Sequence, residues 1–477
     1  MKVALIHYHL RTGGVTRVLK AQSEALTRAK VEHLILSADD EPDYPSASIP
    51  ELDYTTSSSL KPVELYQALL TACEKDFGSP PDLWHIHNAT LGKSILFPGL
   101  IELIAASQTP LILQLHDFAE DNRPANYPAL VGERIYPVAP QIHYAFINSR
   151  DRNSLEAAGL PPHQSHLLPN AVQVEEASAL PNTPSNTPSS GPGSLRTVLY
   201  PIRAIRRKNI GEVILLAALA PTNTRFAISL APENKEWLKT YLRWEEFSTQ
   251  HQLPVLFDVV NKVAPAEGEA NDFEAWKQHA THFITTSIAE GFGLTFLEPS
   301  AIHKPLFGRN IPEITCDFDQ EGIALDSLYS SIPIPLAELD QEKLRTQLSR
   351  ELSSHYQRYQ QPFSEQLAEE AWQHLTAENV VDFGSLPESF QEEVILRALS
   401  HPTDFPLRDW LAEILEKTTP TTAPADLSHY SPERCQSRLL TLYQEAVNAP
   451  RHEPTYLSKE RVLLQYLSPQ RFHFLRS

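Results

Sequence analysis

Cysteine is scarce in this chain, with three among 477 residues. Cys73, Cys316 and Cys435 are far apart in the sequence, so their spacing indicates neither a zinc site nor a disulfide framework. Proteins that rely on disulfides belong to oxidising compartments. The scarcity therefore predicts a protein of the reducing cytoplasm.

Long hydrophobic runs and an excess of positive charge are also missing. No stretch approaches the roughly 18 apolar residues that a membrane-spanning helix needs. Residues 1–7 have the pattern of a strand and not of a signal peptide. Lysine and arginine number 40 against 59 acidic residues, a formal net charge of −19. This balance predicts no nucleic-acid partner and no stable membrane association.

The length allows two or three domains, and buried strands alternate with helices through the first part of the chain. Such alternation predicts an α/β fold with a parallel sheet covered on both faces. Ligands of these sheets gather at the carboxyl ends of the strands. The predicted elements of this half are strands at 2–8, 33–37, 83–87, 111–116 and 145–149, with helices at 16–28 and 62–75.

A segment rich in proline, serine, threonine and asparagine, 177–194, interrupts this pattern and is typical of a linker. A second α/β alternation follows, and from about residue 336 only helices are predicted. We therefore expect an N-terminal Rossmann-like domain at 1–176, a second one at 195–335, and a helical extension at 336–477 that could pack back on the first. The predicted elements are strands at 197–201, 225–230, 255–259, 282–286 and 305–309, helices at 210–219 and 233–250, and helices of the extension at 339–359, 364–375, 388–399, 407–417, 433–447 and 459–466.

The most informative segment is 287–298, in which Glu290 and Glu298 stand eight positions apart around a Gly-Phe-Gly turn. Glycines let the backbone turn sharply and approach a ligand closely. If a helix begins near Leu294, its first free N–H groups form an anion site. Glu298 would then lie about one turn into that helix, where a carboxylate can accept hydrogen bonds from a ribose diol.

A second segment places four cations, Arg203, Arg206, Arg207 and Lys208, directly after a predicted strand and before a helix. Cations in this position can offset the charge that builds on a departing diphosphate. We expect Arg206 and Arg207 to face solvent.

Glycines and histidines follow strands of the first half. Gly13 and Gly14 lie between the first strand and the first helix, and His116 ends a strand. His85 and His87 share one face of another strand. Neither this pair nor the acidic residues beside His116 show a spacing specific for a metal, so we predict no metal site.

The two glutamates with Gly-Phe-Gly-Leu between them resemble the signature of retaining GT-B glycosyltransferases, specifically the large family 4. The resemblance covers residues 1 to about 314. It implies a GT-B fold, in which two Rossmann-like parallel-sheet domains face a cleft that holds the active site. The helical extension lies outside the resemblance.

By this resemblance Arg203 and Lys208 hold the donor diphosphate, Glu290 binds hydroxyls of the donor sugar, and Glu298 binds the nucleotide ribose. His116 matches a histidine that hydrogen-bonds a sugar hydroxyl. The predicted catalytic set is therefore Arg203, Lys208, Glu290 and His116. The predicted donor-binding set is Gly13, Gly14, Gly291, Phe292, Gly293, Leu294, Thr295 and Glu298, and the acceptor-side set is His87, Arg11 and Arg17.

The resemblance also implies a reaction: a nucleotide-activated hexose is attacked on its front face, and the departing phosphate oxygen takes the acceptor proton. No side chain need then act as a general base, and neither a cofactor nor a metal is required. The sequence does not tell whether the donor carries UDP, GDP or ADP. It does not determine the oligomeric state either. Two other interpretations stay open, a catalytically silent GT-B scaffold or partner subunit, and another GT-B enzyme such as a phosphorylase or epimerase.

The acceptor is predicted to be small and water-soluble. Acidic residues also exceed basic ones in the first half, and no polybasic helix is found there. His7, His9, Arg11 and Arg17 gather around the Gly13-Gly14 loop in the sequence. Scattered cations at a strand end suit an acidic or sugar-like molecule, such as a sugar acid or sugar phosphate.

Overall fold

The computed structural model describes residues 1–130, 132, 134–174, 194–266, 270–417 and 423–476. Apart from Ser194, the predicted linker at 177–194 lies outside the described residues. The chain forms two compact units. Unit 1 comprises Met1–Ala171, Ser353–Ser364 and His429–Arg471, and unit 2 comprises Val172–Leu352, Glu365–Ser428 and Phe472–Ser477.

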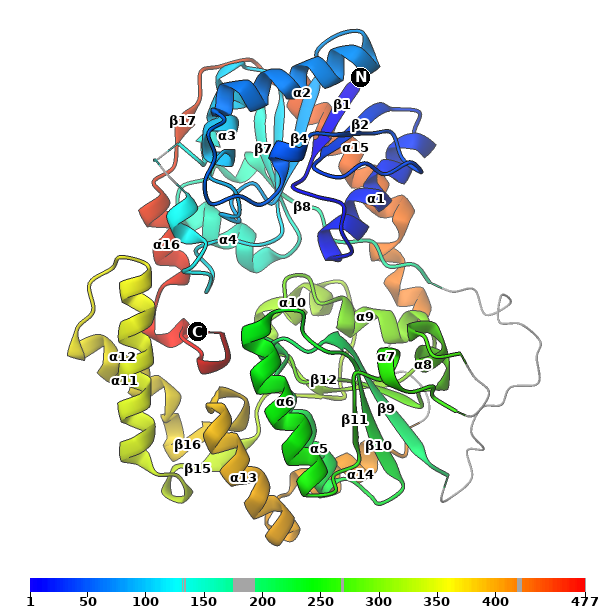
Figure 1. Cartoon of the computed structure of the whole chain (residues 1–477), viewed down its shortest axis with the longest axis vertical. Coiled ribbons are helices and arrows are strands. Elements are labelled where there is room, and N and C mark those ends of the chain that lie inside the picture. Colours follow the sequence, from blue (N-terminus) through cyan, green and yellow to red (C-terminus); the bar gives the residue numbers. More distant parts are fainter. Residues whose placement is uncertain (131, 133, 175–193, 267–269, 418–422, 477) are drawn as a thin grey trace. The chain divides into compact units, whose positions relative to one another are not determined.

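Unit 1 is built on a seven-stranded parallel sheet with the strand order β3-β2-β1-β4-β5-β7-β8 (Figure 1). Strands β4, β5 and β7 are buried along their whole length, as expected for a parallel sheet with both faces covered. Its elements are β1 (Lys2–Ile6), α1 (Gly14–Arg28), β2 (Glu32–Ser37), β3 (Ser46–Ser48), α2 (Pro62–Phe77), β4 (Leu83–His87), α3 (Phe97–Ala106), β5 (Leu111–Leu115), β6 (Pro137–Val138), β7 (Ile142–Phe146), α4 (Ser149–Ala157) and β8 (Ser165–Leu167).

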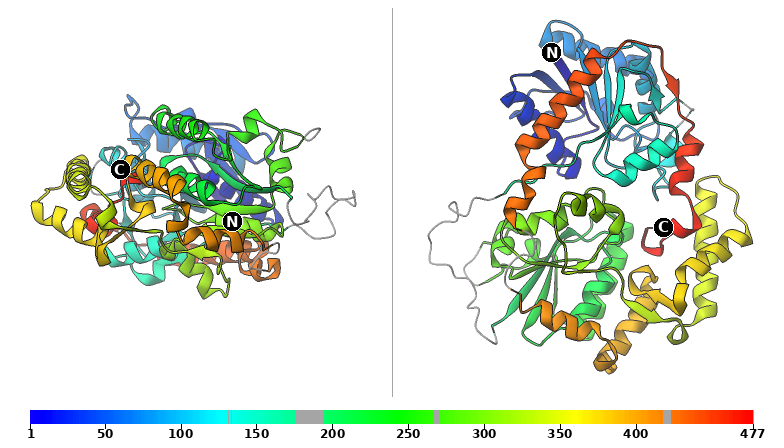
Figure 2. Two further views of the ribbon diagram at one scale, coloured as in Figure 1. Left: turned by 90° about the horizontal axis from the view of Figure 1, so that it is seen from below. Right: turned by 180° about the vertical axis from the view of Figure 1, so that it is seen from behind.

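Helices cover both faces of this sheet. Leu83 of β4 shares a core with Leu19 of α1 and Leu442 of α15 (Pro432–Asn448). The next residue, Trp84, contacts Tyr66 of α2, with 6.2 Å between ring centroids. Because successive side chains of a strand point to opposite faces, α1 and α15 lie on one face and α2 lies on the other (Figure 2).

The predicted helical extension is divided between the two units. Helices α15 and α16 (Lys459–Tyr466) belong to unit 1, where β17 (Thr455–Tyr456) also pairs with β6. Unit 2 holds α12 (Glu365–Leu375), α13 (Glu388–Ser400) and α14 (Leu407–Ile414), together with an antiparallel pair of β15 (Pro333–Pro335) and β16 (Val380–Asp382). The division falls within α11 (Gln341–Arg358).

Unit 2 contains a six-stranded parallel sheet with the order β11-β10-β9-β12-β13-β14. One core of this unit gathers Leu199, Trp276 and Phe283 between the sheet and its helices. The elements are β9 (Arg196–Arg203), α5 (Ile210–Leu219), β10 (Thr224–Leu230), α6 (Lys235–Gln250), β11 (Val255–Phe257), α7 (Val259–Lys262), α8 (Phe273–His279), β12 (His282–Thr285), α9 (Leu294–Ala301), β13 (Leu306–Arg309), α10 (Pro312–Gln320) and β14 (Leu328–Tyr329).

Several predicted strands end before the predicted residue, and for two of them the cause is local. The strand predicted at 145–149 ends at Phe146, because the Asn148 side chain accepts a hydrogen bond from the Asp151 N–H at 2.7 Å and caps α4. The strand predicted at 255–259 ends at Phe257. There Asp258 adopts a left-handed conformation with φ 56° and opens α7.

No helix among the described residues combines the length and the apolar character that a bilayer span requires. Cys73, Cys316 and Cys435 are all free thiols.

Candidate functional site

In unit 2, two candidate loops leave neighbouring strands and are hydrogen-bonded to each other. β9 and β12 pair directly, so the loops that follow them lie side by side. The Ile288 N–H donates to the Arg207 carbonyl at 3.0 Å, and the Thr286 hydroxyl donates to the Lys208 carbonyl at 3.0 Å. These bonds bring the predicted cation segment and the predicted Glu-x7-Glu segment into one site, although about 80 residues separate them in the chain.

Glu290 is held by two cations of the neighbouring loop. Its carboxylate accepts a hydrogen bond from the Lys208 ammonium, and its other oxygen lies 3.0 Å from Nη1 of Arg207. Burial alone would raise the pKa of Glu290, but the charges of Lys208 and Arg207 outweigh it and lower the pKa to about 2. Burial lowers the pKa of Lys208 to about 8, against the opposing effect of Glu290. Glu290 is therefore ionised at neutral pH, and Lys208 is mostly charged.

The other two cations of the segment point elsewhere. Arg203, at the end of β9, is exposed and pairs with Glu233 at 3.0 Å. Arg206 donates two hydrogen bonds to the Glu388 carboxylate of α13, at 2.6 and 2.8 Å. The prediction that Arg206 and Arg207 face solvent is wrong, because each holds a carboxylate brought close by the tertiary fold.

Helix α9 begins at Leu294, as the sequence predicted. Gly293 before it has φ 90°, and a Cβ there would approach Phe296 Cδ2 to 2.7 Å, so both backbone and packing require glycine. The Phe292 side chain is buried against Phe318, with 5.7 Å between ring centroids. Phe292 can therefore offer a ligand only its backbone. Gly291 and Leu294 are half-buried.

The first turn of α9 carries a buried hydroxyl without a partner. Thr295 is 9% exposed, and its Oγ1 has no hydrogen-bond partner among the residues that the structure describes. Unsatisfied buried hydroxyls are uncommon and costly. The helix N-terminus beside this hydroxyl also favours negative charge. Glu298 lies one turn further along α9 and is half-buried.

In unit 1, a group of histidines stands at the carboxyl ends of three adjacent strands, β1, β4 and β5. His87 is fully buried and stacks between His85, at 4.4 Å, and His116, at 5.4 Å, with His87 Nδ1 3.1 Å from His116 Nε2. Within the described chain, Nε2 of His87 and Nδ1 of His7 have no hydrogen-bond partner. Burial lowers the pKa of His7 and His85 to about 3 and that of His116 to about 4. The group is therefore neutral at pH 7, and each ring carries one N–H donor and one lone pair that can accept.

Asn88 holds His116 in place. This asparagine has φ 55°, and its side-chain oxygen accepts hydrogen bonds from the N–H groups of His116 and Asp117, both at 2.9 Å. His85, on the same strand as His87, lies 2.7 Å from the Tyr443 hydroxyl through Nδ1. His85 therefore supports α15, whereas His87 and His116 sit at the strand ends.

The Gly13-Gly14 loop opens α1 and is exposed. A Cβ added at Gly14 would have no described atom within 4 Å, so local packing does not require glycine there. Arg11 is exposed, pairs with Asp53 and lies 3.9 Å from Asp39. Arg17 is exposed on α1. Arg11 is thus held by two acids at the edge of the loop.

Sequence reasoning missed Arg207 as part of these sites, and it did not foresee that Asn88 holds His116. The role of Arg207 depends on which strand lies beside β9, and local spacing carries no signal for this. The role of Asn88 could have been predicted from its position. Asparagine after a strand often takes the left-handed conformation, and its side chain then hydrogen-bonds neighbouring backbone groups.

Comparisons with known proteins bear on the class of this chain. No protein-family model matches it. It is 24% identical over 491 residues to the mannosylglucosyl-3-phosphoglycerate synthase of Petrotoga mobilis, with 94% of this chain and 92% of that protein covered. In fold it resembles Anabaena Alr3699/HepE in complex with UDP, with TM-score 0.52, 12% identity and coverage of 93% of this chain and 100% of that one. A glycosyltransferase from Rickettsia africae ESF-5 gives TM-score 0.50, 13% identity and coverage of 94% and 98%.

These likenesses confirm the predicted fold class: the chain has a GT-B fold with two Rossmann-like parallel sheets. The likeness to the Petrotoga mobilis synthase also supports glycosyltransferase activity.

Proposed function

We propose that this chain is a retaining glycosyltransferase of family-4 type, which moves a hexose from a nucleotide sugar to a small, soluble acceptor that is acidic or sugar-like. The observation that carries this proposal is the meeting of three features in unit 2. They are the cations after β9, the ionised Glu290 after β12, and the Thr295 hydroxyl in the first turn of α9, which has no partner among the described residues.

The donor diphosphate would bind where positive charge and free donors converge. Arg203 and Lys208 supply the cations, and the backbone at 291–295 with the Thr295 hydroxyl supplies neutral donors. Glu290 would accept hydrogen bonds from hydroxyls of the donor sugar, and Glu298 from the ribose. A neutral His116 suits a hydroxyl of the same sugar, because its uncharged ring can accept a hydrogen bond.

In the proposed reaction, the bond between the sugar anomeric carbon and the diphosphate oxygen breaks. The acceptor oxygen bonds to the same face of that carbon, so the configuration is retained. The acceptor proton passes to the departing phosphate oxygen. Lys208 and Arg203 stabilise the charge on the nucleoside diphosphate, and neither a cofactor nor a catalytic metal takes part.

The proposed acceptor class follows the chemistry named for the Petrotoga mobilis relative, a phosphorylated glycerate bearing sugars. The sequence-based prediction, a sugar acid or sugar phosphate, names the same class of molecule and is part of this proposal. Three free cysteines support a cytoplasmic location.

The test is release of nucleoside diphosphate from a panel of UDP, GDP and ADP sugars, with 3-phosphoglycerate, glucosyl-3-phosphoglycerate and neutral sugars as acceptors. We expect turnover with one donor and an acidic acceptor, and NMR should show an unchanged anomeric configuration in the product. Lys262→Ala is the matched control, since Lys262 is an exposed lysine of unit 2 paired with Glu245. Absence of turnover with every pair would favour the scaffold interpretation.

A further inference from the structure

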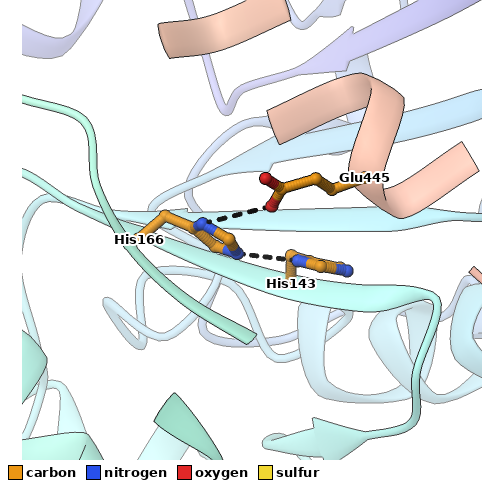
Figure 3. A group of neighbouring side chains, drawn as sticks. All are labelled: His143, His166 and Glu445. Atoms are coloured by element: carbon orange, nitrogen blue, oxygen red, sulfur yellow. Dashed lines mark hydrogen bonds and ion pairs between the residues drawn. The ribbon is translucent and has the colours of Figure 1, made fainter. Parts of the chain in front are cut away.

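Three side chains of types that can bind a metal converge at one edge of the unit 1 sheet: His143 of β7, His166 of β8 and Glu445 of α15 (Figure 3). One possible ligand atom from each residue lies within 4.8 Å of the others. His166 pairs with Ala145 across the two strands, and His143 lies two residues before Ala145. Both rings therefore project from the same face, and α15 covers that face.

The tautomer of His143 is set by its surroundings. Nε2 of His143 lies 3.1 Å from the carbonyl oxygen of Pro140. Because a carbonyl only accepts, Nε2 carries the proton and Nδ1 presents a lone pair. That lone pair faces Nε2 of His166 at 2.7 Å. A backbone carbonyl that fixes the far nitrogen in this way is the usual support of a metal-binding histidine.

The two rings and the Glu445 carboxylate have more hydrogen-bond acceptors facing one another than N–H groups to donate to them. If His166 Nε2–H donates to His143, the remaining nitrogen of His166 is a lone pair that faces the Glu445 carboxylate at 3.7 Å. A bound cation would satisfy all three groups at once.

We propose that His143, His166 and Glu445 bind one divalent transition-metal ion, best matched by zinc. Two imidazoles and one carboxylate form a zinc-type ligand set, whereas magnesium and calcium prefer oxygen ligands alone. Nitrogens bound to a tetrahedral zinc lie about 3.3 Å apart, so the two rings need to separate by about 0.6 Å. The Glu445 side chain is 50% exposed, which leaves a path for the ion and a place for water as fourth ligand.

The ion would join a helix from the end of the chain to the edge of the first sheet. His143 and His166 belong to the last two strands of the sheet order, and Glu445 belongs to α15. The proposed site is therefore a structural clamp on α15. It is independent of the proposed transferase reaction, since none of its residues is assigned a part in that reaction.

Calorimetry with zinc chloride tests the site on the untagged full chain after chelator treatment. We expect one zinc ion per chain in the wild type. His143→Ala and His166→Ala should each lower the zinc affinity by about tenfold or more. Glu445→Gln should lower it too, and this position is half-exposed, so the change tests the carboxylate with little effect on folding. His163→Ala is the matched control, because His163 is an exposed histidine in the same turn region as His166.

A second readout separates specific binding from binding at other histidines. Zinc should raise the thermal unfolding midpoint of the wild type and of His163→Ala, but not that of the His143→Ala/His166→Ala double variant. Cobalt should give the absorption bands of a tetrahedral site in the wild type. It should not give them in the His143→Ala/His166→Ala double variant. No saturable binding, or equal affinity and equal stabilisation in the double variant, overturns the proposal.

Discussion

The ammonium group of Lys208 and the carboxylate of Glu290 form a buried ion pair that joins the loop after β9 to the loop after β12. The two side chains are 11% and 9% exposed, so water screens their attraction weakly. A diphosphate that binds here would compete with Glu290 for Lys208. The proposed site is thus arranged around a charge pair that a donor can reorganise.

Lys208→Ala and Arg203→Ala should each lower turnover by about 10²–10³-fold, because each removes a donor to the charge that develops on the leaving diphosphate. The rate of nucleoside diphosphate release measures the loss. Lys262→Ala should retain wild-type turnover. Near-normal rates in both Lys208→Ala and Arg203→Ala would contradict the diphosphate assignment.

Glu298→Gln should weaken binding of the free nucleoside diphosphate more than Glu290→Gln does, since Glu298 is assigned to the ribose. A hydrogen bond to a charged group contributes roughly 1.5–3 kcal/mol, which corresponds to about 10- to 100-fold in Kd. Glu290→Gln should instead reduce discrimination among donor sugars. Calorimetry and kcat/KM for paired donors compare the two variants, and the reverse order of effects would mean that the two roles are exchanged.

His116→Ala should leave nucleoside diphosphate affinity nearly unchanged and lower transfer. His116 belongs to unit 1, whereas Arg203, Lys208 and Glu298, which are assigned to the diphosphate and the ribose, belong to unit 2. The measurement is Kd against kcat, with circular dichroism as the control for folding. A large loss of affinity in a normally folded variant would refute this division of roles.

The stability of the protein should fall as pH decreases from about 6.5 to about 5. Folding lowers the pKa values of His7 and His85 to about 3 and that of His116 to about 4 through burial, so the unfolded chain binds more protons in this window. Each such histidine contributes a slope of about 1.4 kcal/mol per pH unit below its unfolded pKa. Glu120 contributes a slope of the opposite sign, because burial raises its pKa to about 7 and the folded chain then binds the extra proton. Its slope offsets that of one histidine.

Denaturant unfolding at a series of pH values measures this slope. His116→Ala should make it shallower, since one depressed histidine is removed. A free energy of unfolding that is constant between pH 6.5 and 5 would show that these histidines are not buried in the neutral form.

The chain should not co-float with anionic liposomes, because acidic residues outnumber basic ones by 59 to 40. Each lysine or arginine near an anionic surface contributes only about 1 kcal/mol, so stable docking needs a basic cluster. Flotation at low and moderate salt is the measurement. Robust co-flotation, or transfer to a lipid acceptor but to no soluble one, would show that the predicted acceptor class is wrong.

Local pattern was sufficient for most of the secondary structure. The helix at 210–219, the strand at 83–87 and the helix at 459–466 begin and end where the sequence predicted. The start of α9 at Leu294 was also predicted, since Gly293 before an apolar run signals a helix start. These features depend on neighbours in the chain, whose side chains repeat with the period of a helix or a strand.

The sequence alone also determined the two α/β halves and the residue types of the candidate donor site. Only the tertiary structure decided how those residues are paired. Arg207 turns to Glu290 because β12 lies beside β9, and His87 is enclosed because β1, β4 and β5 are adjacent. α15 joins the first sheet, and Glu445 reaches His166, because Leu442 and Tyr443 bury their apolar surface there. Strand order and helix packing follow from burial summed over the whole chain, and local periodicity carries no information about partners that lie hundreds of residues apart.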